Sequence, residues 1–542
     1  MSKTRALLVV ARQEWSLLLA ALVALALRTQ QLGGQILVGD EWHALEKAAS
    51  APYGEIATTL GTADHSIPIA LYYRAVSDTF GLSEVWIRAP FLLAGLATVV
   101  GLSLAARRFV ERATSDVFAW LLAVSPVLVF YSRFARPYAL TCLLAMAALL
   151  SFHSWWRERR RRPAILYALA VAFGGYLHSA VLPFVLAPLP FFFLRALRAD
   201  PETRRAGVRA LFGIASMTGA ALALLLLPPF LLDPEGLGRH SGWGLPVAGT
   251  VLRALRIFAG TDGAFVALAL FLPAVVGLVS LARRASEVTA LFAIAGALQF
   301  AAVFFIAPAH RSDVFAFARY LLPLLPPALL AVACGVRVLL LWIPAHSRAL
   351  AGPLLGGWLL AVGPLPATWT RPDNWAANHL AFGILGRQDT LADGVPHVPD
   401  FYLRLLDSPP RSLTLVEAPW FPPIFANPQP YYQRLHRQRV RIGFLSAPDS
   451  GPKRGELPWP ASGFALHNFL FIEELLGPGT PTADYLVLHR DLRREYDLNS
   501  APVLIELADE QHRDIAPLVE RCRQRFGAPE FEDEWVVVFR LR

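Results

Sequence analysis

Cysteine and charge are both scarce in this 542-residue chain. It contains three cysteines, of which Cys142 and Cys334 lie in long apolar stretches and Cys522 stands alone in the C-terminal region, so an intradomain disulfide there is excluded. Charged residues make up 17% of the chain, hydrophobic residues 55%, and the mean hydropathy is +0.44. An ordinary soluble protein is not so apolar, so the composition excludes that class.

Several common functional motifs are also missing. The sequence has no dinucleotide-binding fingerprint, no phosphate-binding P-loop, no Cys/His set with zinc spacing and no internal repeat. The net charge of +9 is carried mostly by short basic loops, so nothing indicates nucleic-acid binding.

The apolar residues gather in long stretches, and about 20 such residues cross a bilayer as one helix. Runs rich in Leu and Ala, such as LLLAALVALAL, favour helix over strand. The predicted spans lie near residues 15–32, 85–106, 115–131, 138–156, 164–178, 180–196, 208–230, 263–282, 288–307, 319–342 and 350–368. We therefore predict a polytopic α-helical membrane protein with about eleven transmembrane helices. Gly174, Gly175 and Pro183 interrupt one region and predict a kinked or re-entrant pair there.

Basic residues follow every second predicted span. These segments are Arg107, Arg108 and Arg112, then residues 155–163, 199–209 and 282–285. Because short cytoplasmic loops carry the excess of Lys and Arg, we place these loops in the cytoplasm of a multi-pass plasma (inner) membrane protein. The N-terminus, with Lys3, Arg5 and Arg12, fits the same side and continues into an uncleaved anchor.

An odd number of spans leaves residues 371–542 outside the cell, as a domain distinct from the transmembrane domain of residues 1–370. Strand-like runs lie at 412–418, 440–447, 484–490 and 534–542, and the helix-like segments YYQRLHRQ and DIAPLVERCRQRF lie between them. This pattern predicts a small extracytoplasmic α/β domain.

Acidic residues cluster in the long loop of residues 33–84, on the predicted outer face. Asp40 and Glu41 follow the first span, and Asp64 and His65 lie further along. At the membrane surface such groups can meet a lipid headgroup. Simpler readings are that Asp40 caps a helix beginning at Glu41, that Glu41 is a solvated carboxylate, and that Asp64 and His65 form a polar turn before a helix opened by Pro68.

Arginines stand at the membrane edge of the same outer face. Arg133 and Arg136 lie in SPVLVFYSRFARPYALT, while Arg311, Arg319 and Tyr320 lie in AHRSDVFAFARYLLPLLPP. Arginine at that depth is costly unless it is paired or functional, and its planar fork suits bidentate phosphate binding. The alternative is an arginine that snorkels from a helix end, for Arg133 and Arg311 above all.

These segments together resemble one family. An acidic pair after the first span, an Asp/His-x-x-Pro element followed by LYY, the segment YSRFARPYAL and a late RYLLPLLPP are similar to the GT-C membrane glycosyltransferases, of the protein mannosyltransferase and aminoarabinose transferase type (glycosyltransferase family 39 and its bacterial relatives). The resemblance covers about residues 10–345 in order and topology.

The resemblance implies roles for particular residues. It implies that Asp40 is the catalytic carboxylate with Glu41 beside it, and that Asp64 and His65 complete the acidic centre. It also implies that Arg136, with Tyr131 and Tyr138, and Arg319, with Tyr320, hold the donor phosphate. The sequence departs from the family pattern at Arg133-Phe134, which adds a positive charge near the donor site, and at HSIPIALYY, which bears on the role of His65.

The residue types fit such chemistry in their own right. A sugar on a polyprenyl phosphate has an ionised leaving group, so the enzyme needs positive charge on the phosphate and a base for the acceptor hydroxyl. One carboxylate base without a covalent nucleophile predicts inversion. We predict a hexosyl or pentosyl transferase that uses a polyprenyl-phosphate sugar and a lipid, glycan or protein acceptor, within membrane lipids and without nucleic acid.

Two questions stay open at the level of sequence. No cofactor is required, but a divalent metal is compatible with Asp40, Glu41, Asp64 and His65, whose spacing matches no specific ligand set. The alternative function is a transporter or flippase of a lipid-linked or anionic substrate, which predicts broken helices in two matching halves. A third possible function is a cell-envelope scaffold whose outer domain binds a partner. This function does not explain the acidic and arginine segments.

Overall fold

The computed structural model describes residues 3–30, 51–60, 66–233, 248–261, 264–306, 314–344, 348–366, 397–418, 429–440, 483–490 and 515–542, with scattered positions within 32–48 and 472–481. The chain forms two compact units. Unit 1 comprises Met1–Gln30, Ala57–Ile69 and Pro90–Pro366, and unit 2 comprises Gln31–Ile56, Ala70–Ala89 and Ala367–Arg542. Unit 2 thus includes parts of the loop of residues 33–84.

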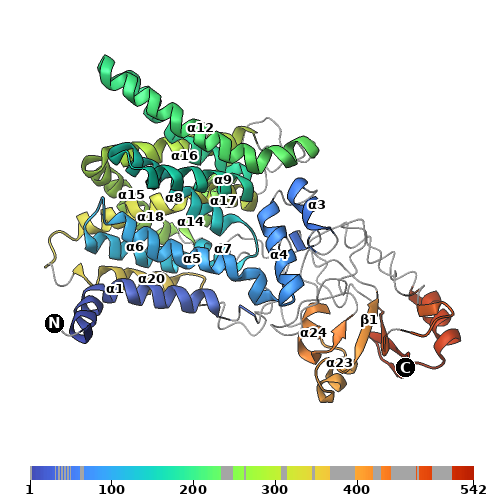
Figure 1. Cartoon of the computed structure of the whole chain (residues 1–542). Helices are drawn as coiled ribbons and strands as arrows, with labels where there is room; N and C mark the ends of the chain where they lie inside the picture. Colours follow the sequence, from blue (N-terminus) through green and yellow to red (C-terminus); the bar gives the residue numbers. More distant parts are fainter. Residues whose placement is uncertain are drawn as a thin grey trace. The chain divides into compact units, whose positions relative to one another are not determined.

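Unit 1 is a bundle of helices that run side by side (Figure 1). Its helices are α1 (Lys3–Thr29), most of α5 (Glu84–Ala106), α6 (Arg112–Val124), α7 (Pro126–Arg133), α8 (Tyr138–Glu158), α9 (Arg161–Leu177), α10 (Leu182–Leu186), α11 (Pro188–Leu197), α12 (Pro201–Leu232), α14 (Ala248–Ala259), α15 (Ala264–Arg284), α16 (Ser286–Ile306), α17 (Val314–Leu321), α18 (Leu325–Leu339) and α20 (Ala351–Val362). Each predicted span coincides with one of these helices or with a broken helix, which confirms the helical class.

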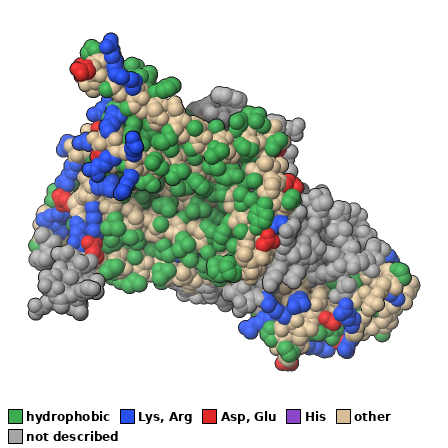
Figure 2. Space-filling view, in the orientation of Figure 1, with side chains coloured by type: hydrophobic (Ala, Val, Ile, Leu, Met, Phe, Trp, Pro, Cys, Tyr) green, Lys and Arg blue, Asp and Glu red, His purple; other side chains and the backbone are tan. Residues whose placement is uncertain are grey.

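The lengths and composition of these helices fit a membrane protein. Seven of the described helices are long and apolar enough to cross a bilayer, or eight if α6 and α7, which meet at a 56° bend, are one span. Apolar side chains cover much of the visible face of the bundle, and Lys and Arg gather at one end (Figure 2). We call this end the basic end. The count of about eleven spans stays a prediction.

Three helices of unit 1 are broken at the end of the bundle opposite the basic end. α6 gives way to α7 at Ser125, the 3₁₀ turn η2 (Ser179–Val181) separates α9 from α10, and the turn η4 (Leu322–Leu324) separates α17 from α18. The interruption predicted from Gly174, Gly175 and Pro183 is present, but α9 continues through both glycines to Leu177. Such breaks free backbone polar groups, which inside a membrane need partners from neighbouring helices.

Two helices touch backbone to backbone. A Cβ atom added to Gly277 of α15 would lie 1.7 Å from the Ala331 carbonyl oxygen, and one added to Gly335 of α18 would lie 1.8 Å from the Pro273 oxygen. Small residues permit such close helix contact where water provides no driving force between helices. The contact fixes α18, and through η4 it helps to fix the end of α17.

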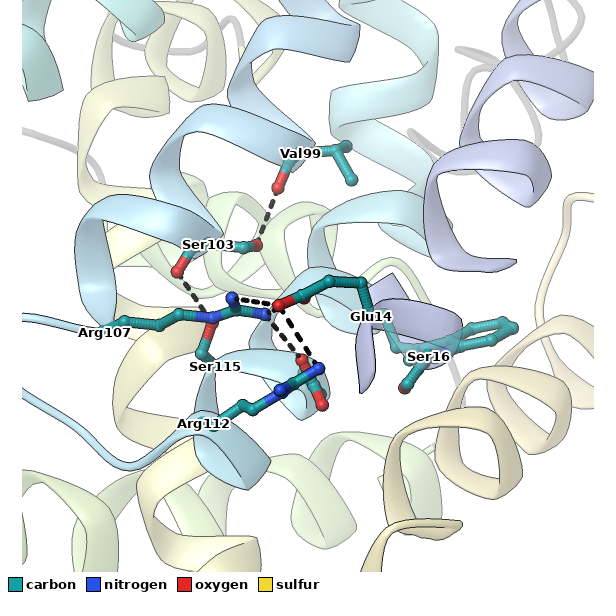
Figure 3. Close-up of polar contacts among 9 residues, drawn as sticks. Glu14, Ser16, Val99, Ser103, Arg107, Arg112 and Ser115 are labelled. Atoms are coloured by element: carbon teal, nitrogen blue, oxygen red, sulfur yellow. Dashed lines mark hydrogen bonds and ion pairs between the residues drawn. The ribbon is translucent and has the colours of Figure 1, made fainter. Parts of the chain in front are cut away.

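Carboxylates hold helix ends together at the basic end. Glu14 of α1 accepts hydrogen bonds of 3.0 and 2.7 Å from Arg107, and Arg112 lies 3.3 Å from the same carboxylate (Figure 3). Glu111 pairs with Arg284 and Arg337, each at 3.1 Å. The hydrogen bond from Arg337, and after it the one from Arg284, lowers the pKa of Glu111. These partners come from different helices and from the turn after α5, so each carboxylate joins several segments.

Unit 2 contains a five-stranded sheet. The strands are β1 (Thr414–Ala418), β2 (Arg439–Val440), β3 (Tyr485–His489), β4 (Phe531–Glu532) and β5 (Val536–Arg540), in the order β2-β1-β3-β5-β4. β1 is parallel to β2 and β3, and β5 is antiparallel to β3 and β4. The small α/β domain predicted from the sequence is confirmed, and the part of the run 440–447 beyond β2 lies outside the described residues.

Alternate strand residues face opposite layers of this unit. Val416, Leu486 and Val537 pack with Ile515 and Leu518 of the helical segment 515–526 on one face. Glu417 of β1 and His489 of β3 point to the other face, since side chains alternate along a strand.

The second face carries a buried polar cluster under α23 (Asp400–Arg404) and α24 (Gln429–His436). The Tyr402 hydroxyl donates to Glu417 Oε1 at 3.0 Å and lies 3.3 Å from His489 Nε2. The Tyr402 ring also stacks on His436 at 5.4 Å, and the His436 Nδ1 accepts the backbone N–H of Gln438 at 3.0 Å. These side chains are almost fully buried.

Unit 2 should lose stability in acid through His436. Burial lowers the pKa of His436 to about 3, whereas an unfolded histidine titrates near 6.5. The unfolded chain therefore binds a proton that the folded chain does not, so the stabilisation present above about pH 6.5 falls by about 1.4 kcal/mol per pH unit toward pH 3. Hydrogen exchange of residues 429–440 in the full chain, followed against pH, measures this slope.

The matched variant is His436→Phe, which keeps a ring on Tyr402 but does not titrate. We expect the protection of this variant to fall less steeply between pH 6.5 and 4. The difference in slope should correspond to about one fewer proton taken up on unfolding. An unchanged slope in this variant would assign the acid sensitivity to other groups.

Candidate functional site

Glu41 lies in a buried ion pair in unit 2. Nε and Nη2 of Arg88, from the first turns of α5, lie 2.9 Å from Glu41 Oε1 and Oε2, and both side chains are 0% exposed. Arg88 Nη1 also donates to the Leu32 carbonyl at 2.8 Å. The simpler reading of Glu41 as a solvated carboxylate is therefore wrong. Asp40 lies outside the described residues, but its neighbour is held at a fixed place.

A second buried arginine organises the same region. Arg74 of α4 (Ile67–Thr79) lies 3.1 Å from Asp78 and donates to the carbonyl oxygens of Ala48, at 3.2 Å, and Ala51. The Tyr53 hydroxyl donates to the same Asp78 at 2.9 Å. α4 begins just before Pro68, which confirms the helix predicted there, whereas Asp64 and His65 lie outside the described residues.

Arg133 of α7 is directed into unit 1. Its Nη1 donates to the Leu27 carbonyl of α1 at 2.9 Å, and the residue is 2% exposed. The alternative that Arg133 snorkels from a helix end is therefore wrong, and its predicted part in phosphate binding stays a prediction. Arg311, for which the same alternative was open, lies outside the described residues.

Arg28, which was not among the residues predicted from the sequence, occupies the break between α6 and α7. Its Nη1 and Nη2 donate to the carbonyls of Ala123 and Leu122 at 2.8 and 3.1 Å, and its Nε lies 3.2 Å from Ser132 Oγ. A cation at a helix C-terminus satisfies freed carbonyls and the helix dipole. An arginine inside the first predicted span was the signal that could have identified it.

The two arginine segments predicted to share one face meet at Tyr138, the first residue of α8. The guanidinium carbon of Arg136 lies 5.9 Å from the centre of the Tyr138 ring, and that of Arg319 lies 5.6 Å from it. Tyr320 and Tyr131 also contact this ring, with centroid distances of 6.3 and 5.2 Å. Arg136 is buried, and Arg319 and Tyr320 are half-buried.

Two further polar side chains belong to this place and were not predicted. The His178 ring lies 5.3 Å from Tyr320 and 5.7 Å from Tyr138. Gln299 of α16 is fully buried and donates from Nε2 to the carbonyls of Ala180 at 2.8 Å and Tyr320 at 2.9 Å. A lone Gln in an apolar span was a signal for it. We call Tyr131, Arg136, Tyr138, His178, Arg319 and Tyr320 the tyrosine–arginine site.

An apolar cavity of about 520 Å³ adjoins this site. Leu321, which directly follows Tyr320, and Leu324 line it together with Phe258 and Phe304. The remaining lining comes from α10, α14, α15, α16 and α18 and is apolar apart from Thr289. Such a lining is suited to an apolar chain.

The described residues contain no group of three or more His, Cys, Asp and Glu side chains placed to hold a metal ion. Of the predicted acidic set only Glu41 belongs to them, and its carboxylate pairs with Arg88. The question of a metal at Asp40, Asp64 and His65 therefore concerns positions outside the described ones.

Comparisons with known proteins gave structural similarities only. No protein-family profile matches the chain, and no curated protein matches its sequence. The chain is similar to ArnT from Cupriavidus metallidurans bound to undecaprenyl phosphate (14% identity, 97% of this chain and 98% of that chain, TM-score 0.49) and in the apo state (15%, 98% and 98%, 0.48). It is also similar to the Archaeoglobus fulgidus oligosaccharyltransferase in complex with zinc and sulfate (14%, 93% and 70%, 0.44).

Proposed function

We propose that the chain is an integral membrane glycosyltransferase that moves a sugar from a polyprenyl-phosphate donor to a lipid, glycan or protein acceptor outside the cytoplasm. One observation carries this proposal: Arg136 and Arg319, far apart in the sequence, both lie over the ring of Tyr138. Two guanidinium groups brought to one place in a membrane bundle make a positively charged site, and phosphate fits their planar forks.

The donor phosphate is the leaving group of the proposed reaction. As the bond between the sugar C1 and the phosphate oxygen breaks, the electron pair stays on the phosphate. Arg136 and Arg319 stabilise this growing charge, more strongly in a site shielded from water than at a surface. The tyrosine hydroxyls of Tyr138 and Tyr320 add donors beside them.

The polyprenyl tail occupies the apolar cavity of about 520 Å³ in this proposal. Leu321 and Leu324 begin that cavity within a few residues of Arg319 and Tyr320. When the arginines bind the donor phosphate, the attached polyprenyl chain would therefore enter an apolar environment.

Asp40 is the proposed base for the acceptor hydroxyl. It takes the hydroxyl proton while the oxygen attacks C1, and a single displacement of this kind inverts the anomeric carbon. Glu41, whose carboxylate is engaged by Arg88, positions the backbone beside Asp40. Asp64 and His65 complete the proposed centre, and a divalent metal there is compatible with their side chains but is not required.

The location follows from charge. The basic end faces the cytoplasm of the inner membrane, and the tyrosine–arginine site, at the opposite ends of α8 and α9, faces outward. The domain of residues 371–542 is extracytoplasmic in this arrangement. Broken helices also occur in transporters, so a flippase of a lipid-linked anion is the second candidate.

Transfer of labelled sugar in detergent tests the proposal. Purified full-length protein is given a panel of polyprenyl-phosphate sugars, with the lipid, glycan and protein fractions of host membranes as acceptors. We expect transfer by the wild type and a loss of about 10²–10⁴-fold in Asp40→Asn with unchanged thermal unfolding. Full activity in Asp40→Asn would refute the base, and no transfer from any donor would favour the flippase.

A further inference from the structure

His178 stands at the break between α9 and η2. Its backbone is extended, with φ −164° and ψ 112°, and its side chain caps the following turn. The ring Nδ1 accepts the backbone N–H of Ala180 at 3.3 Å. An imidazole nitrogen that accepts a hydrogen bond carries no proton, so the neutral ring bears its proton on Nε2 and donates from there.

The surroundings of the ring connect it to the tyrosine–arginine site. The His178 ring contacts both Tyr138 and Tyr320, and the guanidinium carbon of Arg319 lies over both of these tyrosine rings, at 5.6 and 5.1 Å. The imidazole is half-buried, and Arg319 and His178 contact the same two tyrosine rings.

Gln299 keeps this arrangement in place. Its amide nitrogen bridges the carbonyls of Ala180, two residues beyond His178, and Tyr320. The turn that carries His178 and the helix end that carries Arg319 and Tyr320 are thereby tied through one side chain. The imidazole is thus held relative to the arginines with little freedom, which is the condition for a preorganised binding group.

We propose that His178 is a third hydrogen-bond donor to the donor phosphate, through Nε2, beside Arg136 and Arg319. This inference rests on the proposed function, because it names a ligand of the same phosphate. A neutral donor is suited to the task, because it binds the phosphate without adding a third full positive charge that would hold the released polyprenyl phosphate more tightly.

Binding of undecaprenyl phosphate to the purified full chain in detergent tests the inference, with undecaprenol as the probe that lacks the phosphate. His178→Asn and His178→Ser keep an N-cap acceptor but lose Nε2, whereas His178→Gln keeps a terminal N–H donor at similar reach. We expect the Asn and Ser variants to bind undecaprenyl phosphate about 10–100-fold more weakly, with binding of undecaprenol unchanged. We expect His178→Gln to recover most of the loss.

The outcomes separate the inference from the function on which it rests. If the Asn and Ser variants bind as tightly as the wild type while Arg136→Ala is weakened, His178 is only a cap and the inference is overturned. If the Gln variant is as weak as the Asn variant, the donor role is likewise overturned. If Arg136→Ala and Arg319→Ala also bind like the wild type, the proposed phosphate site itself is wrong.

Discussion

Replacing Arg88 with leucine is expected to lower the free energy of unfolding by about 3–5 kcal/mol, because it leaves a buried carboxylate without its charge partner. The Glu41 carboxylate and the Arg88 side chain are both 0% exposed and share two hydrogen bonds of 2.9 Å. The variant also removes the hydrogen bond to the Leu32 carbonyl. Chemical unfolding of the full chain in detergent measures the loss.

Two controls separate this effect from a general loss of charge. Arg540→Leu removes an exposed partner of Glu530 at 3.7 Å and should change stability by less than about 1 kcal/mol. The double variant Glu41→Leu/Arg88→Leu should recover part of the loss, since an apolar pair replaces a buried ion pair at little cost. If Arg88→Leu is as stable as the wild type, Glu41 does not depend on this pair.

The same pair also bears on the proposed catalysis. Asp40 precedes Glu41 in the chain, so a loss of the Arg88 contact would loosen the backbone that carries the proposed base. A small displacement of a catalytic group is costly in rate. We therefore expect any Arg88→Leu protein that remains folded to transfer sugar poorly, although neither side chain needs to touch the substrate.

The sequence was most informative where the argument depended on local composition. Long apolar runs located the helices of unit 1, and short strand-like runs located β1, β3 and β5, because each of these patterns is contained within one element. The helix opened by Pro68 and the interruption of the span near Gly174 were predictable for the same reason.

The sequence was least informative about partners across the fold. Arg28 and Ser132, Glu41 and Arg88, and Gln299 and Ala180 are far apart in the chain, and one sequence holds no record of which residues meet. Glu41 looked solvated because its partner in α5 could not be seen. An interruption in this region was predicted from Gly174, Gly175 and Pro183, but the position of the His178 ring beside Tyr320 was not.

The sequence placed Arg136 and Arg319 on the same face of the membrane but did not predict that they contact one tyrosine ring. This contact is the basis of the last prediction. Arg136→Ala should reduce kcat/KM for the polyprenyl-phosphate donor by about 10²–10³-fold, since it removes charge from the leaving phosphate. Arg136→Lys should recover only part of the rate, because an ammonium group lacks the planar fork. Transfer kinetics with a labelled donor measure both.

A matched arginine at the basic end tests whether position matters. Arg195 pairs with Glu287 at 2.8 Å and is about half exposed, so Arg195→Ala removes the same side chain far from the proposed phosphate. It should leave kcat/KM within about 3-fold of the wild type, as expected for loss of an exposed pair. Equal losses in Arg136→Ala and Arg195→Ala would mean that transfer responds to the stability of the bundle. A loss confined to Arg136→Ala and Arg319→Ala, and smaller in the double variant than the product of the two, would mean that both guanidinium groups act on one phosphate.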